Sequence, residues 1–417
     1  MTQEKVLIMA VNLPQQREDQ FTSSLDELIS LSATAGGTVE QIMTQKRQHI
    51  HPATYLGEGK IVEIKQAIDA LDIDVVISND ELSAGQLRNL SDRFGIRLID
   101  RSQLILDIFA QRAKTKEGQL QVELAQLEYM LPRLHGQGLI LSRLGGGIGT
   151  RGPGETQLET DQRHIRRKID DIKRRLKSIV KQRDQYRKRR RLNNVFQIAI
   201  VGYTNAGKST IFNRLTSSNT LEENQLFATL DPLTRQIQLP TGFEALITDT
   251  VGFLQELPTT LIAAFRSTLE EVSEADFILH VVDASHPDIE QQQQTVLDLL
   301  KELDAHTIPS LTVYNKKDLL DDDFIPMLFP ALLTNAFNDN DIEEIKTKIE
   351  DVLKENWNAY HISVDSFDGK LLHQLDQETI VTEKAFNETR NQYMIKGYMR
   401  ENHPLNRLLK EQENKND

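Results

Sequence analysis

The sequence of 417 residues contains no cysteine, which excludes disulfide bonds and thiolate metal sites and favours a reducing compartment. Long apolar runs are also missing. The stretch 277–282 is among the longest, whereas a membrane-spanning helix needs about 20 apolar residues. The first residues show no cleavage-site pattern, so we expect no signal peptide. These absences predict a cytoplasmic protein without a membrane span, and the length predicts two to four domains.

The charge is unevenly distributed. The net charge is −13, but the segment from Arg163 to Arg191 holds 15 Lys and Arg against three acids, a local charge of +12. The other 388 residues therefore carry −25. This pattern favours binding of a polyanion through one segment, and a solvated helix face is the alternative interpretation.

The first 112 residues alternate short apolar runs with helical patterns, which predicts a small parallel α/β subdomain. Gly57-Glu58-Gly59-Lys60 lacks the flanks of a phosphate loop and is more typical of a turn that begins a helix. The predicted strands are 5–11, 38–44, 73–78 and 96–99, and the predicted helices lie near 23–35, 60–71 and 81–94.

Two heptad patterns follow, one on each side of a glycine-rich stretch. Each has the spacing 4-3-4-3, which predicts two helices of roughly 19 to 28 residues in a hairpin with the glycine-rich loop at its tip. The first pattern comprises Leu120, Leu124, Leu127, Leu131 and Leu134, and the second comprises Ile165, Ile169, Ile172, Leu176 and Ile179.

The glycine-rich stretch contains the pattern Gly-x-Gly-x-x-Gly at Gly147, Gly149 and Gly152. A dinucleotide site requires a strand before this pattern, and here a leucine heptad precedes it. We therefore expect no nucleotide at this loop. Its glycines instead allow close backbone approach to a partner, and Arg143 and Arg151 add positive charge.

A phosphate loop is predicted further along the chain. The apolar run QIAIV leads into Gly202-x-x-x-x-Gly207-Lys208-Ser209, and the helical pattern STIFNRL follows. Backbone N–H groups of such a loop surround phosphate oxygens at a helix N-terminus. Lys208 can reach the β- and γ-phosphates, and Ser209 can bind Mg²⁺.

Two further motifs indicate guanine as the base. Asp249-Thr250-Val251-Gly252 ends one apolar run, and Asn315-Lys316-Lys317-Asp318 follows another. An Asp carboxylate can accept hydrogen bonds from both N1 and N2 of guanine. The series resembles the G domain of Ras-like GTPases. That resemblance implies that Asp249 contacts Mg²⁺ through water, Gly252 binds the γ-phosphate, Asn315 and Asp318 bind guanine, and Lys316 lies along the base.

The segment GGGIGTRGPGETQLETDQR, preceded by VELAQLEYMLPRL, resembles the HflX family of ribosome-associated GTPases. The similarity extends through DELSAGQLRNL, IDRSQLILDIFAQRAKTKE and LFATLDPLTR, so it covers roughly residues 40 to 320. It implies an α/β fold with four parts. These are an N-terminal α/β subdomain (1–112), a basic helical hairpin (113–194), a Ras-like G domain (195–356) and a small C-terminal α+β domain with a polar tail (357–417).

The family resemblance also implies a function. A member binds the large ribosomal subunit near the peptidyl-transferase centre and dissociates intact or stalled ribosomes with GTP, often under stress. We expect the protein to act as a monomer. Other functions left open are large-subunit assembly, a protein-binding signalling switch and ATP-dependent RNA remodelling by residues 1–112. The expected rRNA contacts are Arg143, Arg151, Arg163, Arg166, Arg167, Lys173 and Arg174.

The resemblance assigns Thr229 to the switch I position that binds Mg²⁺. The chain departs from the family where DPLTR replaces DPTTR, and where Thr334-Asn335-Ala336 replaces the usual Ser-Ala of the last guanine loop. Catalysis is expected to involve Lys208, Thr229 and Gly252, and Mg²⁺ to be held by Ser209, Thr229 and Asp249. The full set expected to bind GTP is Gly202, Tyr203, Thr204, Asn205, Ala206, Gly207, Lys208, Ser209, Thr210, Phe227, Thr229, Asp249, Thr250, Val251, Gly252, Asn315, Lys316, Asp318, Asn335 and Ala336.

Phe253 follows Gly252, where self-activating Ras-like enzymes carry a glutamine that orients water. A phenyl ring cannot polarise water, so we expect slow intrinsic hydrolysis that the ribosome stimulates by ordering the switches. Asn205 has two open roles. It can coordinate K⁺, as in some GTPases, or it can brace the phosphate loop.

Overall fold

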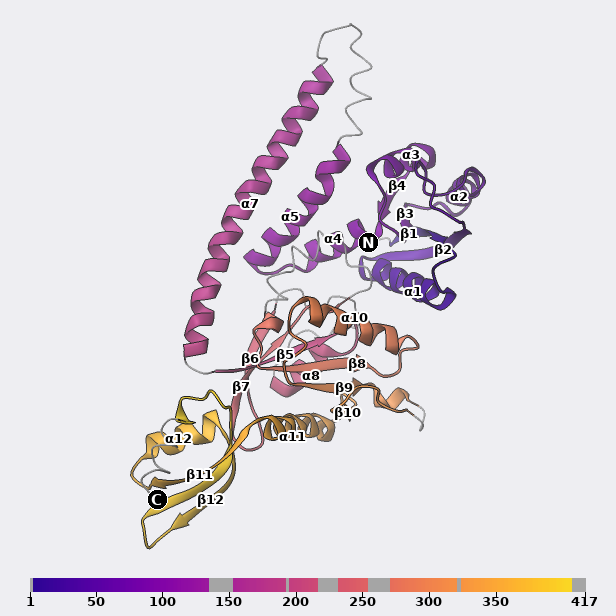
Figure 1. Cartoon of the computed structure of the whole chain (residues 1–417). Helices are drawn as coiled ribbons and strands as arrows, with labels where there is room; N and C mark the ends of the chain where they lie inside the picture. The colour runs from indigo at the N-terminus through magenta and orange to yellow at the C-terminus, as the bar shows by residue number, and fades with distance from the viewer. Residues whose placement is uncertain are drawn as a thin grey trace. The chain divides into compact units, whose positions relative to one another are not determined.

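The computed structural model describes residues 3–134, 153–192, 195–216, 232–253, 271–320 and 324–406, with side chains of α7 described mainly between 160 and 183. These residues form two compact units (Figure 1). The first contains the described residues up to 181, and the second contains the rest. No helix in these ranges combines the length and apolarity needed to cross a bilayer.

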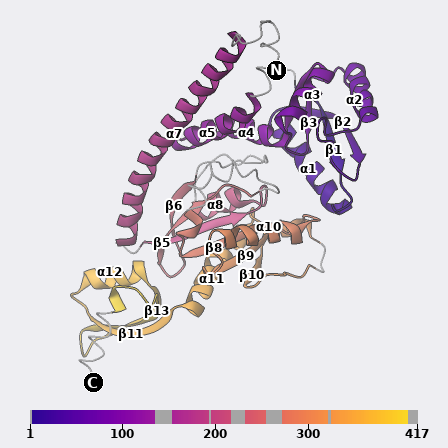
Figure 2. The same ribbon diagram turned by 45° about the horizontal axis from the view of Figure 1, so that its top comes forward.

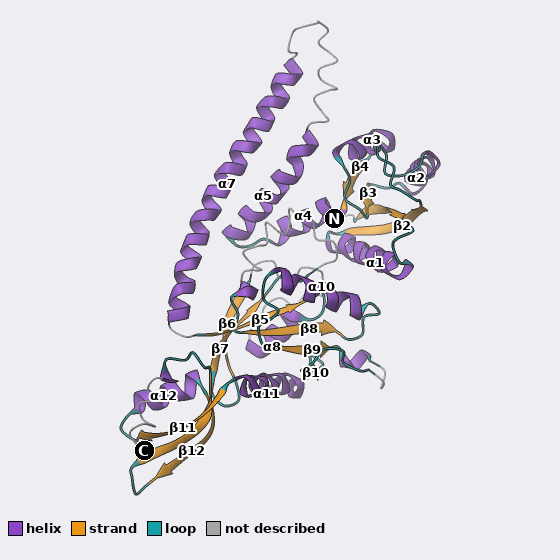
Figure 3. Cartoon of the chain, viewed as in Figure 1, coloured by secondary structure: helices purple, strands orange, loops and turns teal. Residues whose placement is uncertain are grey.

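The first unit contains a four-stranded parallel sheet in the order β2-β1-β3-β4. One core packs strand side chains such as Leu7 and Met9 against Ile61 and Ile64 of α2. Helices lie on both faces of this sheet, with α1 opposite α2 and α3 (Figure 3). The predicted parallel α/β subdomain is confirmed. Its elements are β1 (Glu4–Asn12), α1 (Glu18–Thr34), β2 (Gly37–Lys46), α2 (Glu58–Leu71), β3 (Val75–Ser78), α3 (Ala84–Phe94) and β4 (Arg97–Asp100).

Three helices follow: α4 (Arg101–Arg112), α5 (Lys116–Arg133) and α7 (Pro153–Leu192). Helices α5 and α7 lie side by side as the predicted hairpin (Figures 1 and 2). Two ion pairs join them, from Lys168 to Glu123 at 2.6 Å and from Lys173 to Glu128 at 2.8 Å. The glycine-rich tip, 135–152, lies outside the described residues.

The predicted length of the hairpin helices is wrong for α7, which has 40 residues. The helix continues because no proline or glycine occurs between Glu155 and Leu192. The heptad positions also account for only some of the buried residues of α5. Leu120 is buried in that pattern, but Val122, Ala125 and Tyr129 are buried outside it, because α5 packs against α4 and α3 as well.

The second unit contains a six-stranded sheet in the order β10-β9-β8-β5-β7-β6, parallel except for β6. Helices α8 and α11 contact one face of it and α10 contacts the other (Figure 2). The elements are β5 (Phe196–Gly202), α8 (Lys208–Thr216), β6 (Leu233–Gln238), β7 (Glu244–Asp249), β8 (Phe277–Asp283), α10 (Ile289–Glu302), β9 (Ser310–Asn315), the 3-10 turn η2 (Lys317–Leu319), β10 (Ala331–Leu333) and α11 (Asp339–Asn356).

The chain ends in an antiparallel sheet, β11-β13-β12, with one helix. The elements are β11 (Asn358–Asp365), α12 (Gly369–Glu378), β12 (Ile380–Asn387) and β13 (Gln392–Met399). In the sequence, the runs HISVDSF and NQYMIKGYM predict strands at the positions of β11 and β13, whereas no run predicts β12. Most β12 side chains are exposed, so the strand lacks the alternation that identifies a half-buried strand. Its first residue, Ile380, is buried in the core of the six-stranded sheet.

A candidate nucleotide-binding site

The phosphate loop runs from the end of β5 to the start of α8. Two of its glycines have no room for a side chain. A Cβ on Gly202 would lie 2.1 Å from the Val281 carbonyl oxygen, and one on Gly207 would lie 2.1 Å from Asn315 Nδ2. Both have positive φ angles, +152° and +96°. Asn205, at φ +63°, is exposed at the turn between them.

Lys208 is buried at the start of α8 and donates from Nζ to the Tyr203 carbonyl oxygen at 2.7 Å. Burial lowers the pKa of Lys208 to about 8, while the Asp249 carboxylate acts in the opposite direction. The ammonium therefore lies inside the loop, where phosphate oxygens can replace the carbonyl as its acceptor.

Two of the three magnesium ligands proposed from the sequence, Ser209 and Asp249, are adjacent. Ser209 Oγ donates to Asp249 Oδ2 at 2.8 Å, because β5 and β7 pair in parallel and end at the same edge. A hydroxyl and a carboxylate are ligands that suit Mg²⁺. The described ranges contain no group of three His, Asp or Glu able to hold a metal. Phosphate oxygens of a nucleotide would therefore supply much of the coordination, and Ser209 and Asp249 the protein part.

The segment after β7 is hydrogen-bonded to the phosphate loop. Phe253 N donates to the Gly202 carbonyl oxygen at 3.1 Å, and Thr204 N donates to the Phe253 carbonyl oxygen at 2.8 Å. A Cβ on Gly252 would lie 2.8 Å from Thr204 Cγ2 and 2.9 Å from Lys208 Nζ. Thr250 donates from its hydroxyl to the Ile200 carbonyl oxygen at 2.6 Å. Gly252 is thus placed beside the lysine that is expected to bind phosphate.

The two proposed guanine loops follow the neighbouring strands β9 and β10. Asn315 Nδ2 donates to the Ala206 carbonyl oxygen at 2.9 Å, and Asn315 Oδ1 accepts from Ala336 N at 3.0 Å. One amide therefore links the phosphate loop to both base loops. Asp318 is exposed in the turn η2, where its carboxylate is accessible to a base.

The structure brings together the proposed residues between Gly202 and Thr210, between Asp249 and Gly252, and in the loops 315–318 and 335–336. Tyr203, Thr204, Ala206 and Val251 are buried there, and Thr210 is half-buried. Phe227 and Thr229 lie outside the described residues.

The basic helix α7 displays its charge to solvent. The predicted contacts Arg163, Arg166 and Arg167 are all exposed there. Lys173 and Arg174 are exposed as well, although Lys173 pairs with Glu128 and Arg174 with Asp171. Arg143 and Arg151 belong to the tip outside the described ranges.

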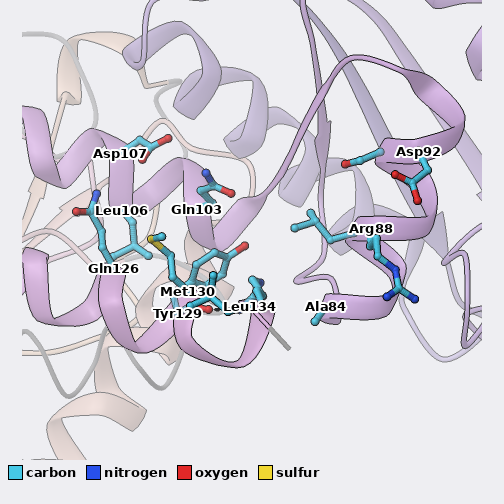
Figure 4. Close-up of a pocket in the computed structure, with 13 residues that line it drawn as sticks. Ala84, Arg88, Asp92, Gln103, Leu106, Asp107, Gln126, Tyr129, Met130 and Leu134 are labelled. Atoms are coloured by element: carbon cyan, nitrogen blue, oxygen red, sulfur yellow. Dashed lines mark hydrogen bonds between the residues drawn. The ribbon is translucent and has the colours of Figure 1, made fainter. Parts of the chain in front are cut away.

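A cavity of about 520 Å³ lies between α3, α4 and α5 in the first unit (Figure 4). Leu106 comes from α4, Met130 comes from α5 and Leu134 directly follows α5, and Arg88 and Asp92 come from α3. Helix α5 contacts both α3 and α4, and the cavity lies near the end of α5 from which the chain continues to residues 135–152.

Arg133 joins the same end of α5 to the α/β subdomain through hydrogen bonds. Its Nη2 donates to the Leu82 carbonyl oxygen at 2.9 Å and to Asp100 Oδ2 at 3.3 Å. Its guanidinium carbon lies 3.4 Å from the centroid of the Tyr129 ring. Asp100 is fully buried and also caps α4 by accepting from Gln103 N. The tip-side end of α5 is therefore joined to the α/β subdomain by charged hydrogen bonds.

Comparisons with known proteins agree with this geometry. Residues 22–110 match a family model described as GTP-binding GTPase N-terminal, residues 112–190 match GTP-binding GTPase Middle Region, and residues 197–316 match 50S ribosome-binding GTPase. GTPase HflX of Alkalihalophilus pseudofirmus is 54% identical over 406 residues, covering 97% of this chain and 96% of that one. The chain belongs to the HflX family of GTPases.

Other HflX proteins are also similar. GTPase HflX of Caldanaerobacter subterraneus is 51% identical over 316 residues, covering 76% of this chain and 73% of that protein. GTPase HflX of Escherichia coli is 48% identical over 305 residues, covering 73% and 72%. The family membership predicted from the sequence is confirmed, and this member is a GTP hydrolase with a Ras-like G domain.

Three residues beside the site of this HflX protein were not predicted. Asp283 Oδ2 accepts from Lys316 Nζ at 2.6 Å, and its place at the end of β8 was the available signal. Asp341 binds Lys317 and has no sequence signal. His280 is buried in β8, where burial first and the Lys208 charge second lower its pKa to about 4. His280 is therefore neutral at pH 7.

Proposed function

We propose that this HflX GTPase binds the large ribosomal subunit and, in its GTP form, dissociates intact or stalled ribosomes. The observation that carries the proposal is the exposed basic face of α7 in a chain whose G domain matches a model described as 50S ribosome-binding GTPase. An acidic protein repels rRNA everywhere except at such a surface. The binding should weaken steeply with salt, because each phosphate contact releases counterions.

The attachment of the hairpin supports a mechanical role. Arg133 joins the end of α5 to Leu82 and Asp100, so the α/β subdomain and α5 move as one body. The two ion pairs from Glu123 and Glu128 extend that body to α7. Contact of the hairpin with rRNA would therefore also position the α/β subdomain. We propose that this body is incompatible with a joined ribosome and acts as a wedge.

The nucleotide selects between two states in this proposal. GTP favours the form that binds the large subunit tightly, and GDP favours the form that binds it weakly. The nucleotide can shift the equilibrium only by its different affinities for the two states. Hydrolysis then restores the weakly binding form. Gly252 and Lys208 are adjacent, so a γ-phosphate at Lys208 would act directly on the Gly252 backbone.

Slow intrinsic hydrolysis is part of the proposal. The Phe253 side chain is only 2% exposed, and its backbone pairs with the phosphate loop, so it offers no group that orients water. The ribosome would complete the catalytic geometry. K⁺ at Asn205 is a second source of positive charge for the transition state, and Asn205 stands exposed on the loop. Replacing K⁺ by Na⁺ at constant ionic strength tests this role, and equal hydrolysis rates would exclude it.

The first experiment is a sucrose-gradient profile of intact ribosomes mixed with the protein and a non-hydrolysable GTP analogue, with GDP as the control. Free subunits with the analogue, and protein in the large-subunit fraction, support dissociation. Binding only to free large subunits or their precursors, with whole ribosomes intact, would instead favour a role in large-subunit assembly.

A matched pair of variants tests the contribution of α7. Arg163→Glu, Arg166→Glu and Arg167→Glu together should abolish co-sedimentation and dissociation. The control changes three exposed lysines elsewhere by the same charge: Lys46→Glu, Lys301→Glu and Lys396→Glu, whose side chains are 79%, 63% and 53% exposed. Equal loss in both triple variants would show that total charge, rather than the α7 surface, controls binding. Both variants should retain intrinsic GTPase activity.

A further inference from the structure

Asp341 connects the two loops that are proposed to bind guanine. Its carboxylate accepts from Lys317 Nζ at 2.6 Å and from the backbone N of Asn335 at 2.6 Å. Lys317 belongs to the loop after β9, and Asn335 belongs to the loop after β10. Asp341 itself is in the first turn of α11 and is 4% exposed. One buried carboxylate therefore holds a side chain of one loop and the backbone of the other.

The two loops are linked at two further points. Lys317 N donates to the Thr334 carbonyl oxygen at 3.0 Å, and Ala336 N donates to Asn315 Oδ1 at 3.0 Å. These contacts lie on either side of the contact with Asp341. The spacing between Asp318 and the Asn335–Ala336 amides therefore depends on a small network in which Asp341 supplies the charge.

The surroundings of Asp341 hold its carboxylate in place. The first turn of α11, which Asn338 caps by accepting from Asn340 N, presents the positive end of the helix dipole. The Lys317 ammonium adds a full positive charge. A buried carboxylate with these partners is held in one position, because moving it would leave its charge unpaired. On the opposite side of the loop, Asp283 holds the adjacent Lys316 in the same way, at 2.6 Å.

We propose that Asp341 is a positioning residue that determines how strongly this enzyme prefers guanine over other purines. It sets the distance between the Asp318 carboxylate, which would accept from guanine N1 and N2, and the Ala336 N–H, which would donate to guanine O6. The inference rests on the proposed guanine contacts of Asp318 and Ala336. It does not rest on the ribosome.

The test compares GDP with IDP by calorimetry on the full chain, together with the thermal midpoint of each variant. Hypoxanthine keeps N1–H and O6 but lacks the N2 amine, so the GDP-to-IDP affinity ratio measures the benefit of a well-placed Asp318. Asp341→Ala should weaken GDP binding about 10-fold and reduce that ratio, since a charged hydrogen-bond network is lost. Asp341→Asn should have a smaller effect. Glu343→Gln, on the exposed side of the same helix turn, should leave both quantities unchanged.

A double variant separates positioning from stability. Lys317→Met with Asp341→Asn removes both charges of the pair, so no ammonium is left without its carboxylate and the thermal midpoint should recover relative to Asp341→Asn. The GDP-to-IDP ratio should remain low. An unchanged ratio in Asp341→Ala, with only a lower midpoint, would overturn the proposal and leave Asp341 as a structural residue.

Asp318→Asn tests the assumption beneath the proposal. An amide at this position can donate to O2 of xanthine but cannot accept from both N1 and N2 of guanine. The variant should therefore prefer XDP over GDP. Retention of the GDP preference would show that Asp318 does not bind the base, which would overturn the role of Asp341 while leaving the ribosome proposal untouched.

Discussion

Asn315 donates its side-chain amide to the carbonyl oxygen of Ala206 at 2.9 Å, although 109 residues separate them in the sequence. The same side chain accepts from Ala336 N on its other side. It lies so close to Gly207 that a Cβ there would meet Asn315 Nδ2 at 2.1 Å. The phosphate loop and both base loops are consequently positioned by one buried amide.

Substitution of this amide should be costly for binding. Asn315→Ala removes two hydrogen bonds and leaves the Ala206 carbonyl and the Ala336 N–H without their partner. At about 1–1.5 kcal/mol for each bond, guanine-nucleotide affinity should fall about 100-fold by calorimetry. Asn356→Ala is the matched control, because the Asn356 amide donates to the Val352 carbonyl oxygen within its own helix and so links no loops. Similar losses in both variants would contradict the linking role of Asn315.

Glycine substitutions should have opposite effects at two positions. Gly202→Ala places a Cβ 2.1 Å from the Val281 carbonyl oxygen, which is backbone and cannot move aside, so stability should fall by about 3 kcal/mol. Gly59→Ala, within α2, meets nothing within 4 Å and should raise stability by about 0.5–1 kcal/mol. Denaturant unfolding of both variants checks the pair. An unchanged free energy of unfolding in Gly202→Ala would mean that β5 and β8 can move apart at this position to make room for the Cβ.

Nucleotide affinity should depend on pH through Lys208. Burial lowers the pKa of Lys208 to about 8 in the free protein, whereas phosphates in the loop would keep it charged. Below pH 8 the lysine is protonated in both states, so it contributes no pH dependence. Above pH 8 the free protein must take up a proton on binding, and affinity should fall by up to about tenfold per pH unit.

Calorimetry in buffers of different ionisation enthalpy measures that proton uptake directly. Uptake approaching one proton at pH 9, and none at pH 7, is the expected result. Lys301→Arg provides a control, because Lys301 lies on the surface of α10 and is 63% exposed. Absence of uptake at pH 9 in the unmodified protein would mean that Lys208 stays charged without phosphate.

The single tryptophan, Trp357, lies at the junction between the six-stranded sheet and the C-terminal sheet. Trp357 packs edge-on against Phe196 at 5.6 Å and Phe243 at 5.4 Å between ring centroids. Trp357→Ala should therefore lower the free energy of unfolding by about 2 kcal/mol, less than for a fully buried ring. Phe367→Ala, at 89% exposure, should have no effect. Equal changes in both would show that the junction adds little to stability.

Much of the nucleotide site could be predicted from the sequence because each part of it is a short contiguous segment after a strand. The site depends on local features: a glycine with a positive φ, a lysine at a helix start and a carboxylate at a strand end. Such features can be recognised from a short stretch of sequence. The four strands of the N-terminal sheet were predictable for the same reason, since their apolar runs are bounded by turns. The family resemblance depended on equally contiguous stretches.

The tertiary structure decided the contacts that join those segments. Asp341 accepts a hydrogen bond from Lys317, 24 residues away in the sequence, and Asp100 accepts one from Arg133, 33 residues away. No motif or residue spacing in the sequence predicts either pair. Strand β12 was missed because its exposed side chains show no alternation, and pairing with β13 supplies what the pattern lacks. Local conformation follows from neighbours in the chain. The partner of a buried charge follows from packing, which brings together residues that the sequence keeps apart.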